Sequence, residues 1–276
     1  MVNTLLIIVL FIIGTIFGSF GGVLISREWD NKWIKSILFW RSMCDKCKKT
    51  LSPIELIPIL SFVAQKWKCK NCGVKLPNFY WIIELLMWCV FVMTYLFFPH
   101  DNIWELVARL AINWWFMLLI IVDYTKYELH FPMWIITTII ALIFAILQSQ
   151  FWKIVISTII FVWVFLWIYF LAKLFVKMKY KVKWEWFGQW DIYLAWTIWI
   201  LFPLVFTTND INFNGINIVY LVLFFILISS VIGLIYAGIR YLFTKNKSKE
   251  LPFIPAMIIS YRIIMVFGNY FINMIS

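Results

Sequence analysis

Charged side chains are scarce in this chain of 276 residues. Asp, Glu, Lys and Arg together make up 13% of the sequence, whereas hydrophobic residues make up 64% and the mean hydropathy is +0.91. A soluble domain of this length does not need so much apolar surface. The composition therefore excludes an ordinary soluble protein and favours one that lies in a membrane.

Histidine is rarer still, and only His100 and His130 are present. No evident combination of serine, histidine and aspartate accompanies them, so the sequence does not offer a serine-type hydrolase site. We interpret His130 as a loop histidine.

Acidic residues are few, since 13 Asp and Glu stand against 24 Lys and Arg and give a formal net charge of +11. Such a charge is also typical of nucleic-acid-binding proteins. Here, however, the basic residues occur in short clusters between long apolar runs, where they act as membrane-orientation signals. We therefore expect a lipid bilayer, and no nucleic acid, as a partner.

Eight apolar runs are long enough to cross a membrane, and the lack of water in lipid requires them to be helices. They are approximately Thr4–Ser26, Tyr80–Phe98, Ile103–Val122, Phe131–Gln148, Phe151–Val176, Ile192–Phe206, Ile216–Phe243 and Phe253–Ile275. The first run lacks a basic n-region and an obvious cleavage site. We expect it to be a retained span and not a signal peptide.

A polar segment, residues 27–79, separates the first two runs and carries four of the five cysteines as two Cys-x-x-Cys pairs. These are Cys44, Cys47, Cys69 and Cys72. Four thiolates in this spacing can surround Zn²⁺ tetrahedrally and leave no position open for water, so the pattern predicts a structural site. Gly73 suits the tight turn of a zinc knuckle. Unligated thiols or disulfides are the alternative, and Cys89 is interpreted as core packing.

Two aspartates stand where an apolar run meets a polar segment. Applied to the loops, the positive-inside rule predicts an outside amino terminus and an inside cysteine segment. Asp123 then ends the third span and Asp191 begins the sixth, both at the cytoplasmic face. Each aspartate is alternatively just the solvated end of a helix. An ionisable group beside a span is nevertheless a site hypothesis by default.

Two such carboxyl groups have a defined chemistry if helix packing brings them within a few ångströms. Like charges at that range do not both ionise, so the pair shares a proton. One carboxylate then acts as a general base toward water, and the other acts as an acid toward the carbonyl or the leaving amine.

Further motifs extend through nearly the whole chain. They are Gly18–Val23, Cys44–Pro53, Ile57–Ser61, Cys69–Gly73, Phe79–Leu86 with Glu84, Asp123 with Pro132, Gly188–Asp191 and Leu251–Ala256. Together they resemble those of the bacterial type IV prepilin peptidases, membrane aspartic proteases of the GxGD class. In this resemblance Asp123 is similar to the first catalytic aspartate, and Gly188–Asp191 falls on the GxGD motif.

The resemblance implies an all-α polytopic membrane protein with about eight transmembrane helices. Residues 1–26 would form the first transmembrane helix, 27–79 a cytoplasmic tetracysteine zinc domain, and 80–276 a seven-helix membrane aspartyl protease core. The protein would lie in the bacterial inner membrane and cut the leader of prepilin or pseudopilin precursors, with Asp123 and Asp191 activating the water. Many such enzymes then methylate the new amino terminus with S-adenosylmethionine.

Several tryptophans depart from the family pattern. Trp67, Trp88, Trp190 and Trp199 stand where the family has glycine or another small residue, and the chain has 18 Trp against 10 Gly. Gly22 and Tyr193 also replace a usual asparagine and lysine. We hypothesise that several of these Trp codons are UGA codons read as glycine in the source organism. Interfacial aromatic belts are the simpler explanation of the excess.

Two alternatives stay open. One keeps the protease without methyl transfer, because the sequence has no glycine-rich nucleotide loop and Glu84 is only a weak candidate for a cofactor site. The other is a non-catalytic membrane scaffold whose zinc module docks a cytoplasmic partner, which a genuine Trp190 beside Asp191 would favour.

Overall fold

The computed structural model describes residues 4–27, 41–44, 46–98, 102–126, 129–148, 151–179, 189–209, 211–244 and 252–274. Gly188 of the expected GxGD segment and Leu251 of the last motif lie outside the described residues. His100, Asp210 and most of the basic loops that predict the orientation lie outside them too.

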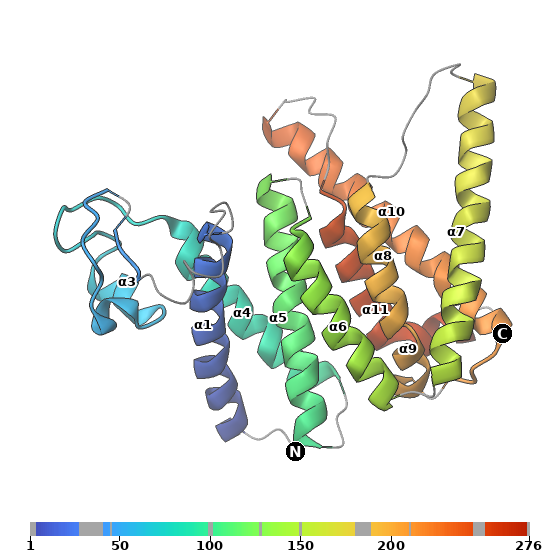
Figure 1. Cartoon of the computed structure of the whole chain (residues 1–276), viewed down its shortest axis with the longest axis horizontal. Helices are drawn as coiled ribbons and strands as arrows, with labels where there is room; N and C mark the ends of the chain where they lie inside the picture. The colour runs from blue at the N-terminus through green and yellow to red at the C-terminus, as the bar shows by residue number, and fades with distance from the viewer. Residues whose placement is uncertain are drawn as a thin grey trace. The chain divides into compact units, whose positions relative to one another are not determined.

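Helices make up nearly all of the regular structure in the described residues, which confirms the expected all-α class (Figure 1). β-type pairing there is limited to two isolated bridges. The chain divides into two compact units, Met1–Leu118 and Leu119–Ser276, and helix α5 (Ile103–Lys126) passes from the first into the second.

Seven helical segments in the described part of the chain are long and apolar enough to cross a membrane. They are α1 (Thr4–Arg27), α4 (Asn78–Phe97), α5, α6 (Phe131–Gln148), α8 and α9 together (Gln189–Leu201 and Pro203–Thr208), α10 (Gly215–Thr244) and α11 (Ile254–Asn273). The remaining expected span coincides with α7 (Phe151–Lys179), whose described apolar part, Phe151–Val164, is shorter. The chain is thus a polytopic helical membrane protein, with the cysteine segment between its first two membrane helices.

One expected helix, Ile192–Phe206, is interrupted. Pro203 has no N–H to give to the preceding turn, so α8 ends at Leu201 and α9 begins at the proline. The Tyr261 hydroxyl of α11 donates to the Leu201 carbonyl at 3.3 Å, which satisfies an acceptor beside the break.

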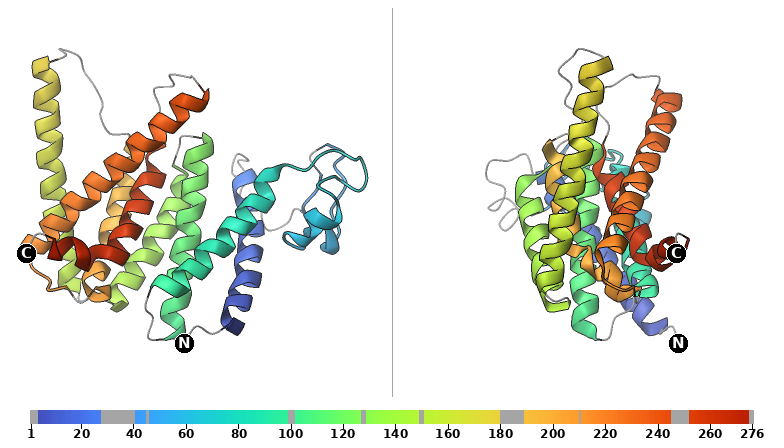
Figure 2. Two further views of the ribbon diagram at one scale, coloured as in Figure 1. Left: turned by 180° about the vertical axis from the view of Figure 1, so that it is seen from behind. Right: turned by 90° about the vertical axis from the view of Figure 1, so that its right-hand side faces the viewer.

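Glycines of α1 allow the first two membrane helices to approach closely, as Figure 2 also shows. A Cβ added at Gly14 would lie 2.8 Å from the Trp88 Cα, and one at Gly18 would lie 2.6 Å from the Glu84 Cα. Small residues at such crossings permit the backbone contact that drives helix association in lipid. Gly14 and Gly18 therefore position α4, and Glu84 on it, against α1.

We expect Gly18→Ala to destabilise the protein by about 1–3 kcal/mol, because the new methyl group meets backbone that has no room to move. Gly215→Ala is the matched control, since nothing lies within 4 Å of a Cβ there. The measurement is the unfolding transition in detergent, followed by circular dichroism. Equal transitions for the two variants would show that the α1–α4 crossing is not as tight as its geometry indicates.

In the second unit, the chain alternates in direction from helix to helix. The last turn of α5 and the first turns of α6, α8 and α11 lie at the same end of this unit in both views (Figures 1 and 2). Side chains from these four helix ends can therefore share one site.

Candidate metal centre and candidate active site

The four cysteines of the two Cys-x-x-Cys pairs converge in the first unit. Their sulfur atoms all lie within 4.8 Å of one another, with Cys44 Sγ 3.8 Å from Cys72 Sγ and Cys47 Sγ 4.0 Å from Cys69 Sγ. Four sulfurs that each sit about 2.3 Å from one Zn²⁺ are separated by about 3.8 Å in a tetrahedron. The cluster can thus hold a metal ion, and its size and thiolate chemistry fit zinc.

The cluster is built from two turns of the same design. The Cys44 N–H donates to the Lys49 carbonyl at 3.0 Å, and the Lys48 N–H donates back to the Cys44 carbonyl at 2.9 Å. Cys69, Gly73 and Val74 repeat both bonds, each at 2.9 Å. The fifth residue of each turn has a positive φ, 56° at Lys48 and 68° at Gly73, which confirms the expected role of that glycine.

Backbone N–H groups of these turns act on the thiols. The Lys49 N–H, followed by the Asn71 side chain, lowers the pKa of Cys47 to about 6, and the Cys72 N–H lowers the pKa of Cys69. The Val74 N–H lowers the pKa of Cys72, but desolvation and the three other thiols outweigh it and raise that pKa to about 11. Because metals bind thiolates, occupation of the cluster must release protons.

Asp123, the first candidate catalytic residue, lies in the second unit near the end of α5 and is 6% exposed. Its Oδ2 accepts a 3.1 Å hydrogen bond from the N–H of Ile254, the first residue of α11. The N–H groups of a first helical turn have no partner within their own helix. Asp123 therefore caps α11, and this bond fixes the orientation of its carboxyl group.

Asp191, the second candidate, lies in the first turn of α8, at the same end of this unit as the last turn of α5 (Figures 1 and 2). A carboxylate in a first turn interacts favourably with the helix dipole. The α8 helix is fixed to α6 beside it, because the Trp134 indole donates to the Tyr193 carbonyl and to Thr197 Oγ1, both at 2.9 Å. The structure thus brings the two predicted aspartates into one neighbourhood.

Two further groups of polar residues were missed or undervalued in the sequence. Glu105 and Arg109 on α5 form a buried ion pair, with Arg109 Nη2 2.7 Å from Glu105 Oε1. Their spacing of four residues within an apolar run could have indicated this pair. Glu84 is 2% exposed and accepts a 2.7 Å hydrogen bond from the N–H of Ile59 in the cysteine segment. No sequence pattern indicates this second contact, because it joins a span to an irregular loop.

Three of the four unusual tryptophans each have one unfavourable feature. Trp67 has φ 58°, a left-handed conformation that costs a residue with a side chain about 1–2 kcal/mol. Trp88 and Trp199 have buried indole nitrogens without a hydrogen-bond partner, which costs about 1–3 kcal/mol each. The side chain of Trp190 lies outside those that the structure describes. The unpartnered nitrogen does not distinguish Trp88 and Trp199 from Trp81, which shares it, and the Trp199 ring packs on Phe161 and Phe202 at centroid distances of 4.1 and 4.0 Å. Among the described positions, only the backbone of Trp67 favours glycine by itself.

We expect codons 67, 88, 190 and 199 of the gene to be UGA. The codons of Trp114 and Trp134 should be UGG, because their indoles donate to Phe17 O at 3.0 Å and to Tyr193 O at 2.9 Å. Sequencing the gene identifies the codons at all six positions. Peptide mass spectrometry of protein from its own source identifies the residue that each codon encodes. A UGG codon at position 190 would contradict the hypothesis at the position next to Asp191.

The fold and the two sites define a class: a multi-pass helical membrane protein with a four-cysteine metal module and a pair of neighbouring aspartates at helix ends. Residues 12–98 match the bacterial peptidase A24 N-terminal domain. They span α1 from residue 12 onward, the cysteine module and α4. The expected resemblance to the bacterial type IV prepilin peptidases is thereby confirmed for this part of the chain.

Curated relatives carry a consistent name. The chain is 45% identical over 86 residues to a "Prepilin leader peptidase/N-methyltransferase" of Bacillus subtilis, covering 30% of this chain and 32% of that protein. Proteins of the same name from Myxococcus xanthus and Vibrio cholerae are 38% identical over 82 residues and 35% identical over 79. These matches cover 30% and 27% of this chain, and 24% and 31% of those relatives. The chain thus matches about a third or less of each relative's length, and no solved structure matches it significantly.

Proposed function

We propose that the protein is a membrane aspartic endopeptidase that removes the leader peptide of type IV prepilins or pseudopilins. The observation that carries this proposal is the buried Asp123, held by the first N–H of α11, at the same end of the helical unit as the first turn of α8, which carries Asp191 (Figures 1 and 2). The similarity of residues 12–98 to the N-terminal domain of A24 peptidases supports a peptidase, although this region contains neither aspartate.

The aspartates would work as an acid–base pair. One carboxylate takes a proton from the attacking water while the protonated partner gives its proton to the carbonyl oxygen, which forms a tetrahedral diol. When the diol collapses, the carboxyl group that holds the water's proton gives it to the leaving amine, and the diol returns a proton to the partner carboxylate. The Ile254 N–H keeps Asp123 oriented through these steps, and the Trp134 contacts keep the first turns of α8 in place. No nucleophilic side chain is needed.

The expected domain plan and location belong to this proposal. Residues 1–26 are the first transmembrane helix, 27–79 a cytoplasmic zinc domain, and 80–276 the protease core. The protein lies in the bacterial inner membrane with its amino terminus outside. The basic residues of segment 27–79 support this orientation, because cytoplasmic loops carry an excess of Lys and Arg.

Two cofactors complete the proposal. Zn²⁺ braces the cysteine module, and its four thiolates leave no open position for a reacting water. S-adenosylmethionine, when bound, would supply the methyl group for the amino terminus that cleavage exposes, since the relatives' names include N-methyltransferase.

The test is incubation of the detergent-solubilised protein with a purified prepilin and S-adenosylmethionine labelled in its methyl group. Leader removal is read as a shorter product with a new amino terminus, and methylation as label in that product. Removal without label would leave the peptidase alone. A prepilin that stays intact under conditions where a known prepilin peptidase cleaves it would contradict the proposal.

A further inference from the structure

One surface of the cysteine module is apolar. It comes from two short helices that pack on each other, η1 (Pro53–Leu56) and α3 (Leu60–Ala64), and from the turn between them. Four large side chains of this surface are each 43% to 69% exposed, and we call them the apolar face: Ile54, Ile57, Leu60 and Val63. Exposed apolar side chains that gather in this way mark a site of interaction with a protein or a membrane.

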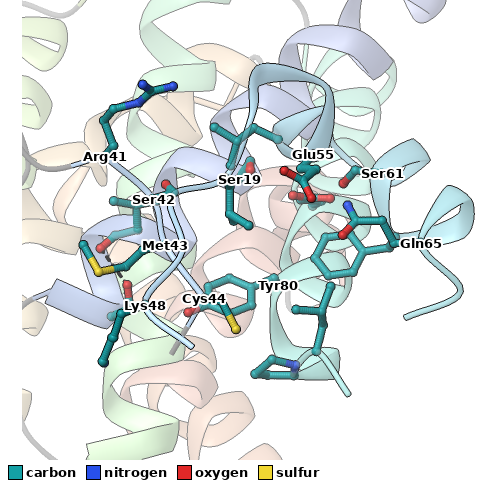
Figure 3. A pocket seen from close by; sticks show the side chains of 18 residues that line it. Ser19, Arg41, Ser42, Met43, Cys44, Lys48, Glu55, Ser61, Gln65 and Tyr80 are labelled. Carbon is teal, nitrogen blue, oxygen red and sulfur yellow. Dashed lines mark hydrogen bonds between the residues drawn. The ribbon is translucent and has the colours of Figure 1, made fainter. Parts of the chain in front are cut away.

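The polar side chains of the same segment lie on its inner side. All three of those in residues 53–65, Glu55, Ser61 and Gln65, line a cavity of about 310 Å³ between the module, α1 and α4 (Figure 3). Leu56 and Phe62 line it too, whereas the described wall includes no residue of the apolar face. A water-soluble domain places apolar groups inside and polar groups outside. The reverse order is typical of a surface that faces lipid, where polar side chains turn toward the protein interior or a cavity.

A hydrogen bond holds this segment beside the membrane helices. The Ile59 N–H, in the turn between η1 and α3, donates to Glu84 Oε2 of α4 at 2.7 Å. Glu84 lies six residues after Asn78, the first residue of α4, which corresponds to about 9 Å along the helix axis. Figures 1 and 2 show α3 beside α1, level with the half of α1 that leads into the module. Amphipathic segments at a membrane surface bury their apolar side chains about 5–10 Å deep, so the level of this segment suits insertion.

Basic residues flank the segment on both sides. Residues 50–65 contain no Lys or Arg. The exposed lysines that precede and follow them are Lys46, Lys48, Lys49, Lys66, Lys68 and Lys70. Eight basic residues stand against two acidic ones in residues 41–77, an excess that outweighs the charge of about −2 on Zn²⁺ held by four thiolates. Lysines close to a membrane surface are attracted to anionic phospholipids.

We propose that the apolar face inserts into the bilayer leaflet in which α1 ends and α4 begins, and that the flanking lysines bind anionic phospholipid headgroups there. Lipid fits this face better than a second protein does, because the level of the segment beside two membrane helices and its basic flanks both match a bilayer. Insertion attaches the module to the membrane at a third point, besides the ends of α1 and α4. This inference goes beyond the proposed peptidase and does not depend on it.

The test is photocrosslinking of the full-length, zinc-loaded protein in nanodiscs of phosphatidylethanolamine and phosphatidylglycerol. Benzoylphenylalanine replaces Leu60 or Val63 in the apolar face, or Lys46 as a control at an exposed position of the same module. Illumination joins it to a neighbouring C–H group, and mass spectrometry of the intact protein identifies the adduct. Positions 60 and 63 should give lipid adducts in about tenfold or higher yield than position 46. Equal yields at the three positions would overturn the inference.

A charge variant tests insertion in a second way, with the crosslinker at position 63. Leu60→Asp places a carboxylate against hydrocarbon and anionic headgroups, so it should lower the yield of lipid adducts about tenfold. Thr50→Asp makes the same change of charge at an exposed position outside the segment, and it should alter the yield less than about twofold. The zinc content of each variant shows whether its module is folded. A folded Leu60→Asp variant that keeps its lipid adducts would contradict insertion.

The identity of the adducts also separates lipid from other partners. Adducts that join two copies of the chain would assign the apolar face to self-association. Adducts to a prepilin added in excess, in place of lipid, would assign it to the substrate. Either result would overturn the lipid inference without contradicting the peptidase. Lipid adducts in a preparation that does not cleave prepilin would support insertion and contradict the peptidase.

Discussion

Asp123→Asn and Asp191→Asn will each reduce the rate of leader removal by roughly 10²- to 10⁴-fold, the range that general acid–base groups contribute. Asparagine has the size of aspartate, and its oxygen can still accept the hydrogen bond that the Ile254 N–H gives to Asp123. Each variant therefore removes the titratable carboxyl group with little change in packing. The measurement is the initial rate of prepilin cleavage by detergent-solubilised protein.

The control for this pair is Asp210→Asn. Asp210 follows the expected span Ile192–Phe206, so the orientation predicted from the loops places it at the membrane face opposite Asp123 and Asp191. This variant should keep the cleavage rate of the unmodified protein. The double variant should be no slower than either single one, because residues that act as one unit lose their function together. Normal cleavage by either single variant would exclude the aspartyl mechanism.

Part of the architecture was predictable because hydropathy is a local property. The runs that became α1, α4, α5, α6, α10 and α11 are continuous and flanked by polar residues, so each coincides with a helix within a few residues. The break between α8 and α9 was not predicted. Its cause, Pro203, lies in the sequence, but a proline in a span kinks or ends a helix depending on what satisfies the freed carbonyl.

The candidate sites were also predictable from the sequence only in part. The cysteine cluster was predictable, because Cys-x-x-Cys spacing and a glycine after the second pair describe a closed local turn. The positions of Asp123 and Asp191 at helix ends also followed from the order of the runs. The Ile254 N–H was not predictable as the partner of Asp123, since 131 residues separate the two. Hydropathy indicates which residues enter the membrane and gives no information on which helices become neighbours.

The contact between Glu84 and Ile59 shows the same limit. A glutamate near the start of a span is a common helix-end residue, and its environment depends on how the cysteine segment returns to the membrane helices. The close α1–α4 crossing at Gly14 and Gly18 determines where Glu84 lies, and the turn at Ile59 then reaches it. Tertiary packing, and not a sequence motif, buries this carboxylate and gives it its partner.

Removing the metal, or replacing one of its ligands as in Cys44→Ser, will unfold the cysteine module. Structural zinc binds cysteine sites with an apparent free energy of about 10–16 kcal/mol, and that free energy is largely the folding free energy of a small metal domain. Residues 41–76 have little else to stabilise them. Their regular structure consists of two isolated bridges and two short helices, Pro53–Leu56 and Leu60–Ala64.

The measurements are metal content and hydrogen exchange of the full chain in detergent. The unmodified protein should contain one zinc per chain, and Cys44→Ser should contain none. Amides of residues 42–51 and 67–76 should then exchange rapidly, because the paired turns that protect them depend on the metal. Cys89→Ser is the matched control, since Cys89 lies outside the cluster on α4 and should leave both the zinc content and the exchange unchanged. Retained zinc in Cys44→Ser would show that the four sulfurs do not share one ion.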